Sequence, residues 1–302
     1  MLTIFSTSRA FKGHYGIIQT NAIRSWLSLH SDCEVILFGN EDGAAEISAE
    51  LGIKHVPEVE CNEYGTPLTN YMFDLAQEIA SNEFVGFVSA DIILMSDFIT
   101  TLQRISKQSF LIVGRRWDME QNELVDFNDP EWESRLRQHL SSHGKLHPPT
   151  AIDYFIFNRG LYRGIPPFAI GRSAVDNWLI YQARFLKAPV INASRVVTAI
   201  HQNHDYSHHP QGTAGVREGP EKKHNVELMG GIDRGFTIEH ATHIMTAEGI
   251  KRAVSPRQLY FRFAAVPVLN PRLYFLRKPM QALTKLIIRT RQLLGITENE
   301  KQ

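Results

Sequence analysis

Short apolar segments alternate with segments of helical apolar spacing through the first part of the chain. The apolar segments, which we expect to form strands, are LTIFST (2–7), CEVILFGN (33–40), FVGFVSADIIL (84–94) and FLIVGRRW (110–117). Segments that favour helices lie between them, at 19–29, 44–51 and 66–80. Strands that are apolar on both faces are typical of a parallel sheet covered on both sides. The pattern therefore predicts an α/β fold with a mostly parallel central sheet and helices on both faces.

The second half of the chain is less regular. It predicts a helix that begins near Pro130, a strand at 151–162 (AIDYFIFNRGLY) and a helix at 171–188. A segment rich in His, Gly and Pro follows at 201–231. Because it is longer than an ordinary connector, we expect a functional loop there.

Charge is distributed unevenly along the chain. The formal net charge is zero, yet residues 251–295 hold ten Lys or Arg and no Asp or Glu. Residues 1–250 must then carry the compensating negative charge. This asymmetry predicts a main domain at 1–250 and a basic, helical C-terminal extension at 251–302.

The sequence favours a cytoplasmic protein. Cys33 and Cys61 are too few to staple a fold of 302 residues, which indicates a reducing compartment. The first residues lack the apolar run of an export signal, and no window is apolar enough for a membrane span. We therefore expect a cytoplasmic location, or the cytoplasmic face of a membrane.

Asp91 is an acid at the end of an apolar strand, in FVGFVSAD. Ligands of open parallel sheets bind in the crevice at the carboxyl ends of the strands. A carboxylate at that edge can hold Mg²⁺ or Mn²⁺ against the phosphates of a nucleotide. The alternative is a cap on a turn or on the helix that SDF, at 96–98, begins.

The order of these features resembles the GT-A class of nucleotide-sugar-dependent glycosyltransferases, of the family 2 type. The resemblance covers residues 2–205: a first strand ending in TST, a second ending in NED, and an apolar strand ending in an acidic motif. Of that motif, Ser89-Ala90-Asp91 keeps only the last acid. The resemblance implies that Asp91 binds Mn²⁺ or Mg²⁺, and that the nucleotide-sugar donor contacts Thr7, Arg9, Asn40, Asp42, Ser89 and Asp91.

The resemblance extends to the segment at 151–184 and implies an acid that removes the proton of the acceptor hydroxyl. Asp176 is the first candidate for this base and Asp153 the second. The alternative for Asp176 is a capping box with Ser173, in which the helix dipole would lower its pKa. Tyr154 and Trp178 are candidates for stacking on the acceptor, with the hydrophobic core as the alternative.

Four histidines crowd the segment AIHQNHDYSHH: His201, His204, His208 and His209. They could assemble a zinc site, although the HExxH signature is absent. The resemblance instead implies that His201, directly after the apolar VVTAI, joins Asp91 at the metal. The third possibility is a set of solvent-exposed histidines without a ligand.

The basic extension mixes Tyr and Phe with Arg and ends in a candidate amphipathic helix whose apolar side would be Leu283, Leu286, Ile287 and Leu294. Such segments suit attachment to an anionic membrane surface. The alternative is a helix packed on the main domain with its basic face in water. No nucleic-acid motif accompanies the charge, so we expect no nucleic-acid partner.

Together these features predict a glycosyltransferase of the hexosyltransferase type. It would move a sugar, with inversion, from a nucleotide-sugar donor to a glycan or lipid-linked acceptor in cell-surface polysaccharide biosynthesis. Two alternatives stay open: a sugar-phosphate nucleotidyltransferase, and a non-catalytic nucleotide-sugar-binding protein whose metal motif has decayed.

Overall fold

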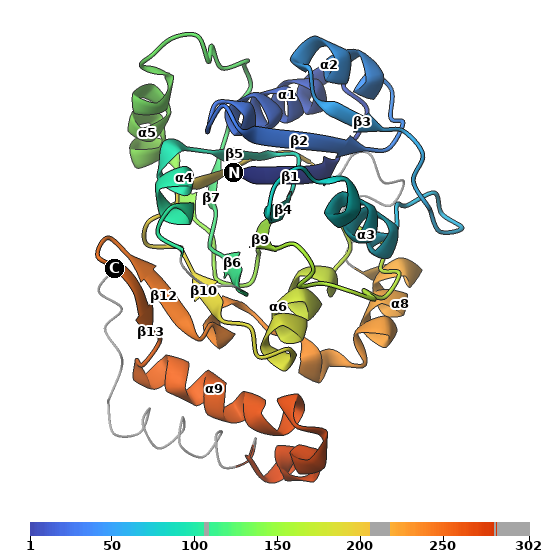
Figure 1. Cartoon of the computed structure of the whole chain (residues 1–302), viewed down its shortest axis with the longest axis vertical. Helices are drawn as coiled ribbons and strands as arrows, with labels where there is room; N and C mark the ends of the chain where they lie inside the picture. The colour runs from blue at the N-terminus through green and yellow to red at the C-terminus, as the bar shows by residue number, and fades with distance from the viewer. Residues whose placement is uncertain (106–108, 206–217, 281, 283–302) are drawn as a thin grey trace.

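The computed structural model describes residues 1–105, 109–205, 218–280 and 282. A large sheet runs through the middle of the molecule (Figure 1). Its strands, in chain order, are β1 (Leu2–Thr7), β2 (Cys33–Phe38), β3 (Lys54–Val56), β4 (Phe84–Val88), β6 (Leu111–Val113), β9 (Tyr154–Asn158), β10 (Val190–Asn192), β12 (His243–Thr246) and β13 (Gly249–Arg252).

The strands of this sheet are ordered β13-β12-β10-β6-β9-β4-β1-β2-β3. Pairing is parallel except that β9 is antiparallel to β4 and β6, and β13 is antiparallel to β12. The predicted α/β class with a mostly parallel sheet is therefore confirmed. Because β1, β4 and β6 run in the same direction, their carboxyl ends meet at one edge of the sheet.

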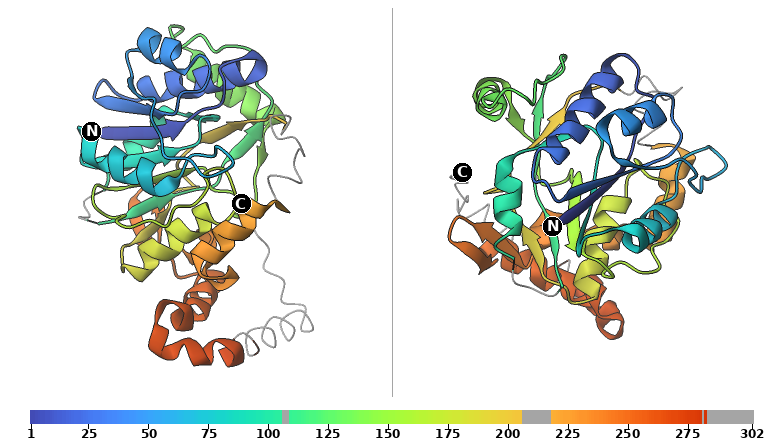
Figure 2. Two further views of the ribbon diagram at one scale, coloured as in Figure 1. Left: turned by 90° about the vertical axis from the view of Figure 1, so that its right-hand side faces the viewer. Right: turned by 45° about the horizontal axis from the view of Figure 1, so that its top comes forward.

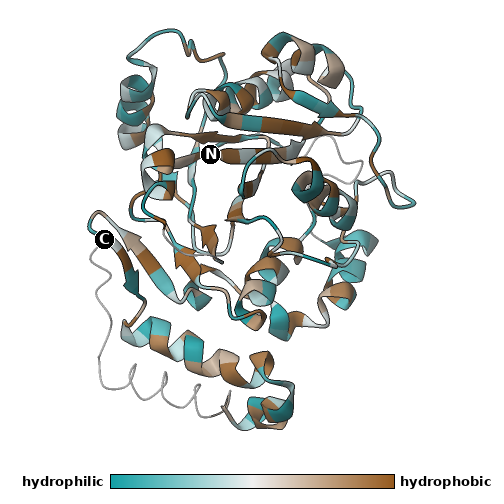
Figure 3. Cartoon of the chain, viewed as in Figure 1, coloured by the Kyte–Doolittle hydropathy of each residue, from teal (hydrophilic) through white to brown (hydrophobic). Residues whose placement is uncertain are grey.

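Helices cover both faces of the large sheet (Figure 2). Side chains of α1 (Gly13–Leu27), α2 (Ala44–Leu51) and α4 (Ser96–Leu102) pack in one buried cluster. Side chains of α3 (Thr69–Ile79), α6 (Val175–Phe185) and α8 (Pro220–Met229) pack in a second cluster on the other face. Successive residues of β1 face opposite sides, so Ile4 joins the first cluster and Phe5 the second. This two-sided burial explains why the strands read as continuous apolar runs, coloured brown in Figure 3.

A second, four-stranded sheet lies beside the first, in the order β5 (Ile92–Leu94), β11 (Ala199–Gln202), β7 (Trp117–Met119) and β8 (Lys145–Leu146). It packs on α5 (Trp132–His143) through a small cluster that includes Ile93, Met119 and Ile200. The prediction of a single strand at 84–94 and another at 110–117 is therefore wrong in one respect. The chain breaks within each of them and passes from the large sheet to the small one.

Helix α1 begins at Gly13, six residues before the helix predicted at 19–29. Its first turn presents His14 and Tyr15, whose side chains bond to the backbone carbonyls of Asn203 and Asp205, far along the chain. Apolar spacing alone gives no sign of this turn, because its contacts are polar. The prediction placed the helix only where its apolar face begins.

The chain ends, as far as the structure describes it, in the hairpin β12–β13, helix α9 (Pro256–Leu269) and the 3₁₀ helix η3 (Pro271–Leu276). The boundary predicted between residues 250 and 251 falls inside β13, which pairs with β12 at the edge of the large sheet. Leu283, Leu286, Ile287 and Leu294 lie outside the described residues. Among the described helices, none combines the length and apolar character needed to cross a bilayer.

Candidate functional site

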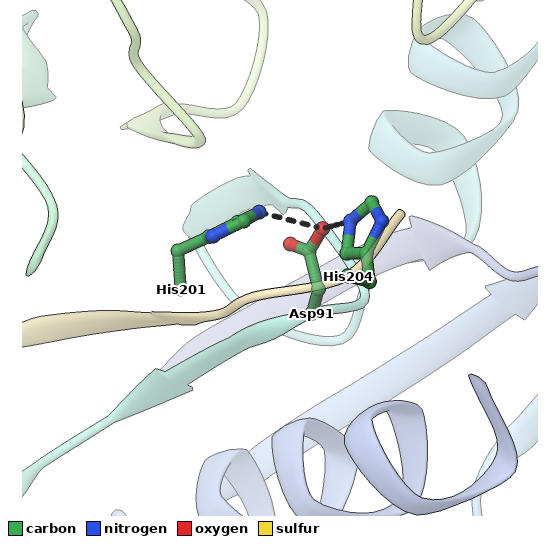
Figure 4. Close-up of side chains that lie close together, drawn as sticks. All are labelled: Asp91, His201 and His204. Carbon is green, nitrogen blue, oxygen red and sulfur yellow. Dashed lines mark hydrogen bonds and ion pairs between the residues drawn. The ribbon is translucent and has the colours of Figure 1, made fainter. Parts of the chain in front are cut away.

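Asp91, His201 and His204 meet at the carboxyl-end edge of the large sheet (Figure 4). Oδ2 of Asp91 lies 3.0 Å from Nε2 of His204 and 3.5 Å from Nε2 of His201. One candidate ligand atom from each residue lies within 4.8 Å of the others. The sequence predicted the pair Asp91 and His201 for a metal, and it left His204 among several alternatives.

Strand pairing and one buried amide hold this group together. Ile92 pairs with His201 in the antiparallel ladder of β5 and β11, which brings the residue before β5 next to the end of β11. Gln202 is fully buried and donates from its backbone N and its Nε2 to the carbonyl oxygen of Asp91, at 3.1 Å each. Its Oε1 accepts a bond from Asn21 of α1 at 3.0 Å. The backbone of Asp91 is thus fixed independently of its side chain.

The Asp91 carboxylate is held in its ionised form. Burial alone would raise its pKa, but the charges and hydrogen bonds of His201 and then His204 outweigh burial and hold the pKa of Asp91 well below its usual range. Its second oxygen, Oδ1, is buried and has no hydrogen-bond partner among the described residues. Buried polar atoms without partners are uncommon in folded proteins. This oxygen is therefore a candidate ligand atom for a cation or a contact for a donor hydroxyl.

Asp118 and its partners, which the sequence interpretation missed, form a layer behind His201. Oδ1 of Asp118 lies 3.5 Å from Nδ1 of His201. Nδ1 of His147 lies 2.6 Å from Oδ2 of Asp118, and Nε of Arg116 donates to Oδ1 at 3.0 Å. Burial would raise the pKa of Asp118, but the His147 bond and the Arg116 charge lower it overall. The signal was available, because RRWD follows strand β6 at the same sheet edge.

Arg116 connects this layer to the predicted catalytic acids. Its Nη1 donates to Oδ2 of Asp153 at 2.9 Å. Burial raises the pKa of Asp153, although the charge of Arg116 opposes the rise. The backbone carbonyl of Asp153 accepts a bond from Ser89 N at 2.9 Å, so Asp153 lies beside the turn that carries Asp91.

Asp176 lies in the first turn of α6. The structure does not agree with the alternative role predicted for it, which was that of a helix cap. The residue before the helix is Ala174, with φ 95°, and no side chain caps the helix, so the capping box with Ser173 is wrong. The expected lowering of the pKa by the helix dipole is also wrong. Burial, and then the nearby charge of Asp153, raise the pKa of Asp176 to about 8. A carboxyl with such a pKa can accept a proton near neutral pH.

The residues predicted for the donor lie around the ends of β1, β2 and β4. Thr7 is half-buried at the end of β1, and Arg9 lies two residues later. The backbone N of Arg9 donates to Oε1 of Gln19 at 2.6 Å, and its carbonyl oxygen accepts from Nε2 of Gln19 at 3.0 Å. Asn40 is exposed just after β2. Asp42 forms an exposed ion pair with Lys12, and Ser89 is half-buried between β4 and β5. The five residues lie at or just after the carboxyl ends of β1, β2 and β4, at the sheet edge that also carries Asp91.

Tyr154 and Trp178, which the sequence predicted to bind the acceptor, are both buried. Tyr154 is fully buried in β9 and packs edge-on against Phe98, with ring centroids 5.9 Å apart. Trp178 is 5% exposed and packs against Phe168 at 5.4 Å. Both rings fill the hydrophobic clusters on either face of the sheet, as the alternative interpretation held. His208 and His209 lie outside the described residues.

No protein-family model matches the sequence, and no curated protein matches it. Among solved structures, the chain is similar to S. aureus TarS in complex with UDP-GlcNAc, at 14% identity, with a TM-score of 0.30 over 41% of this chain. It spans 37% of that TarS chain. It is also similar to glucosyl-3-phosphoglycerate synthase from Mycobacterium tuberculosis in complex with Mg²⁺ and UDP, at 15% identity, with a TM-score of 0.45 over 78% of this chain and 79% of that one. At these identities the likeness concerns the fold, and the chemistry has to be argued from the residues of this chain.

Proposed function

We propose that this protein is a glycosyltransferase that moves a sugar from a nucleotide-sugar donor to a glycan or lipid-linked acceptor. The observation that carries the proposal is Oδ1 of Asp91, which is buried without a hydrogen-bond partner among the described residues, beside two imidazoles at the sheet edge where parallel α/β folds bind ligands. An acid with a pKa near 8, Asp176, lies in the same electrostatic network through Asp153. A cation site and a proton acceptor are the two elements that such a transfer needs.

Asp91, His201 and His204 fit a divalent cation. Their three ligand atoms converge, Oδ1 of Asp91 has no hydrogen-bond partner among the described residues, and the charge of Asp118 lies 3.5 Å behind the His201 imidazole. Two imidazoles favour Mn²⁺ over Mg²⁺, because Mg²⁺ prefers oxygen ligands and keeps its water. When bound there, the cation would neutralise charge on the leaving diphosphate.

The polar side chains around the same edge suit the rest of the donor. Thr7 and Arg9 after β1, and Asn40 and Asp42 after β2, would contact the base and ribose. Ser89 would contact the diphosphate. The charge of Arg9 interacts with that of Asp91, which supports a place for its guanidinium beside the phosphates.

Asp176 would act as general base. Its carboxylate takes the proton of the acceptor hydroxyl, the hydroxyl oxygen forms a bond to the anomeric carbon, and the bond from that carbon to the diphosphate oxygen breaks. A single displacement of this kind inverts the configuration and releases the nucleoside diphosphate. Asp153 is less suited to the role, because Arg116 already occupies its carboxylate.

The exposed surface of α9 supports a lipid-linked acceptor. Leu259, Phe263 and Val266 are 49%, 56% and 42% exposed and follow one another at helical spacing, so they form one apolar stripe. We call these three residues the α9 stripe. Arg257 and Arg262 lie on the same helix, and a basic amphipathic helix suits the surface of an anionic membrane in cell-surface polysaccharide synthesis.

Donor turnover by wild-type protein and by Asp91→Asn tests the proposal. With Mn²⁺ and a panel of UDP, GDP and dTDP sugars, wild-type protein should hydrolyse or bind at least one donor. Asp91→Asn should lose this activity while its thermal melt stays near that of wild type, because the backbone carbonyl and not the side chain holds Gln202. Asp74→Asn, an exposed acid on α3, is the matched control.

Three results would count against the proposal in different ways. Failure of wild-type protein to bind any donor would refute it. Release of pyrophosphate from a nucleoside triphosphate and a sugar phosphate would instead indicate a nucleotidyltransferase. Tight donor binding without turnover across many acceptors would indicate a binding protein.

A further inference from the structure

A basic cavity lies at the opposite edge of the large sheet from Asp91. It is bounded by the end of α6, the start of β10, the hairpin β12–β13 and α9, and has a volume of about 300 Å³. Its charged lining consists of Arg184, Lys187, Arg252 and Arg262, with no Asp or Glu among the lining residues. A cavity of this size lies at the lower end of the range of small-molecule sites.

The positive charges of this cavity have no carboxylate partner in the part of the chain that the structure describes. Within the described ranges, none of its four Lys and Arg residues forms an ion pair with a carboxylate. Arg184 donates to the carbonyl oxygen of His240, and Arg262 donates to that of Ala253 at 3.3 Å. Burial, and then the charge of Arg262, lower the pKa of Arg184 to about 10. The half-buried guanidinium groups therefore repel one another in the absence of an anion.

Lys187 reaches the rim of the cavity from an unfavourable backbone conformation. Its φ is 62°, the left-handed region in which a side chain costs roughly 1–2 kcal/mol. The turn itself is an ordinary helix end, in which Lys187 N bonds to Arg184 O and Ala188 N bonds to Ala183 O. Glycine would fit this position with less strain, so the lysine adds charge to the rim at a conformational cost.

We propose that this cavity binds a phosphate group, either from a soluble phosphorylated compound or from the headgroup of an anionic lipid. Guanidinium groups bind phosphate oxygens with charge-assisted hydrogen bonds, and a lysine adds a compact positive charge. The phosphate would bring the negative charge that the lining lacks. The lipid source deserves its own test because the α9 stripe begins beside Arg262, on the same helix.

The variant Lys187→Gly/Arg252→Gln removes two rim charges without disturbing the partly buried Arg184 and Arg262. Glycine keeps the left-handed turn, so the fold should melt at or above the wild-type temperature. The matched control is Lys145→Gln/Lys251→Gln, which changes the net charge equally at exposed residues that do not line the cavity. Inorganic phosphate is the first probe, titrated calorimetrically at constant ionic strength without divalent metal. Vesicles of phosphatidylglycerol, compared with phosphatidylcholine, are the second.

We expect the rim variant to bind phosphate at least about tenfold more weakly than the control. If the source is a lipid headgroup, the rim variant also loses binding to phosphatidylglycerol vesicles, and phosphate competes with the vesicles. If the source is soluble, vesicle binding is equal in both variants. The proposal is overturned if the rim variant matches the control in both assays. Binding of UDP with Mn²⁺, measured in parallel, should be unchanged in both variants, which separates this cavity from the proposed donor site.

Discussion

Nδ1 of His201 lies 3.5 Å from the carboxylate of Asp118, while Nε2 of the same ring faces Asp91. The ring is therefore flanked by an acid at each nitrogen. Nδ1 forms no hydrogen bond with a described residue, so Asp118 acts on the ring through its charge, which raises the basicity of a metal-binding imidazole. Asp118 is thus a positioning residue for the proposed cation site.

Asp118→Asn should weaken Mn²⁺ binding by about 10- to 100-fold, the usual effect of losing such a partner. Calorimetric titration of Mn²⁺ in the absence of donor measures this directly and does not depend on activity. Asp74→Asn, far from the site on the exposed side of α3, should bind Mn²⁺ as wild type does. Equal affinities of the two variants would show that Asp118 does not support the cation.

Asp176→Asn should slow sugar transfer by about 10²- to 10⁴-fold, as expected for the loss of a general base, and leave donor affinity unchanged. The rate of the wild-type enzyme should rise with pH and level off above about pH 8, where the carboxylate becomes ionised. Steady-state rates at saturating donor between pH 6 and 9 give the profile. If Asp153→Asn, and not Asp176→Asn, removes this pH dependence, the base is Asp153.

The same pKa predicts how stability changes with pH. The folded chain keeps the Asp176 proton up to about pH 8, whereas the unfolded chain releases it near pH 4. The free energy of unfolding should therefore fall as pH rises between these values, by at most about 1.4 kcal/mol per pH unit from this group. Urea denaturation at pH 5 to 8 should show that Asp176→Asn gains stability relative to wild type as pH rises. Parallel curves for the two proteins would contradict the raised pKa.

Tyr154→Phe should leave both acceptor kinetics and stability nearly unchanged. The hydroxyl of Tyr154 is buried and has no hydrogen-bond partner among the described residues, so its removal frees no partner. Tyr162→Phe is the matched comparison, because its equally buried hydroxyl donates to Leu179 O at 2.8 Å. That variant should lose about 1 kcal/mol of unfolding free energy. A specific rise in acceptor KM in Tyr154→Phe would restore the acceptor role.

Phe263→Glu should weaken binding to phosphatidylglycerol vesicles, because it places a negative charge in the middle of the α9 stripe. Co-sedimentation with vesicles measures the bound fraction. Leu124→Glu, which changes an exposed leucine on a distant loop, is the control. If both variants bind vesicles as wild type does, α9 faces water and not a membrane.

The sequence predicted the strands and helices that bury apolar side chains. The predicted ends are most accurate for elements in which an apolar segment stays within one sheet or one helix. Strand β1 and helix α2 agree with the structure at both ends. The split between β4 and β5 was not predictable, because both halves are apolar and the change of sheet depends on pairing with β11, more than a hundred residues later. The burial of Tyr154 and Trp178 was not predictable, because an aromatic side chain gives the same sequence signal in a core and in a binding site.

The candidate site was predictable at Asp91 and His201, whose positions at the ends of apolar runs are local signals. Asp118 and His147 were missed because their importance lies in a contact between residues 29 positions apart. The pKa of Asp176 was expected to fall and instead rises, because burial by the surrounding fold outweighs the helix dipole. Residue spacing in a sequence identifies a helix start, but it does not show how far the fold buries the side chains there.

Only Ser89, Ala90 and Asp91 lie between the last residue of the large sheet's β4 and the first residue of the small sheet's β5, while His201 belongs to the small sheet. The distances between the candidate ligand atoms of Asp91 and His201 therefore depend on how the two sheets align. Ile200→Val, which changes a buried side chain in the core of the small sheet next to His201 in the sequence, would alter cation affinity through this alignment. The core of the small sheet is in this sense part of the site, and its tolerance to mutation would be limited by binding as well as by folding.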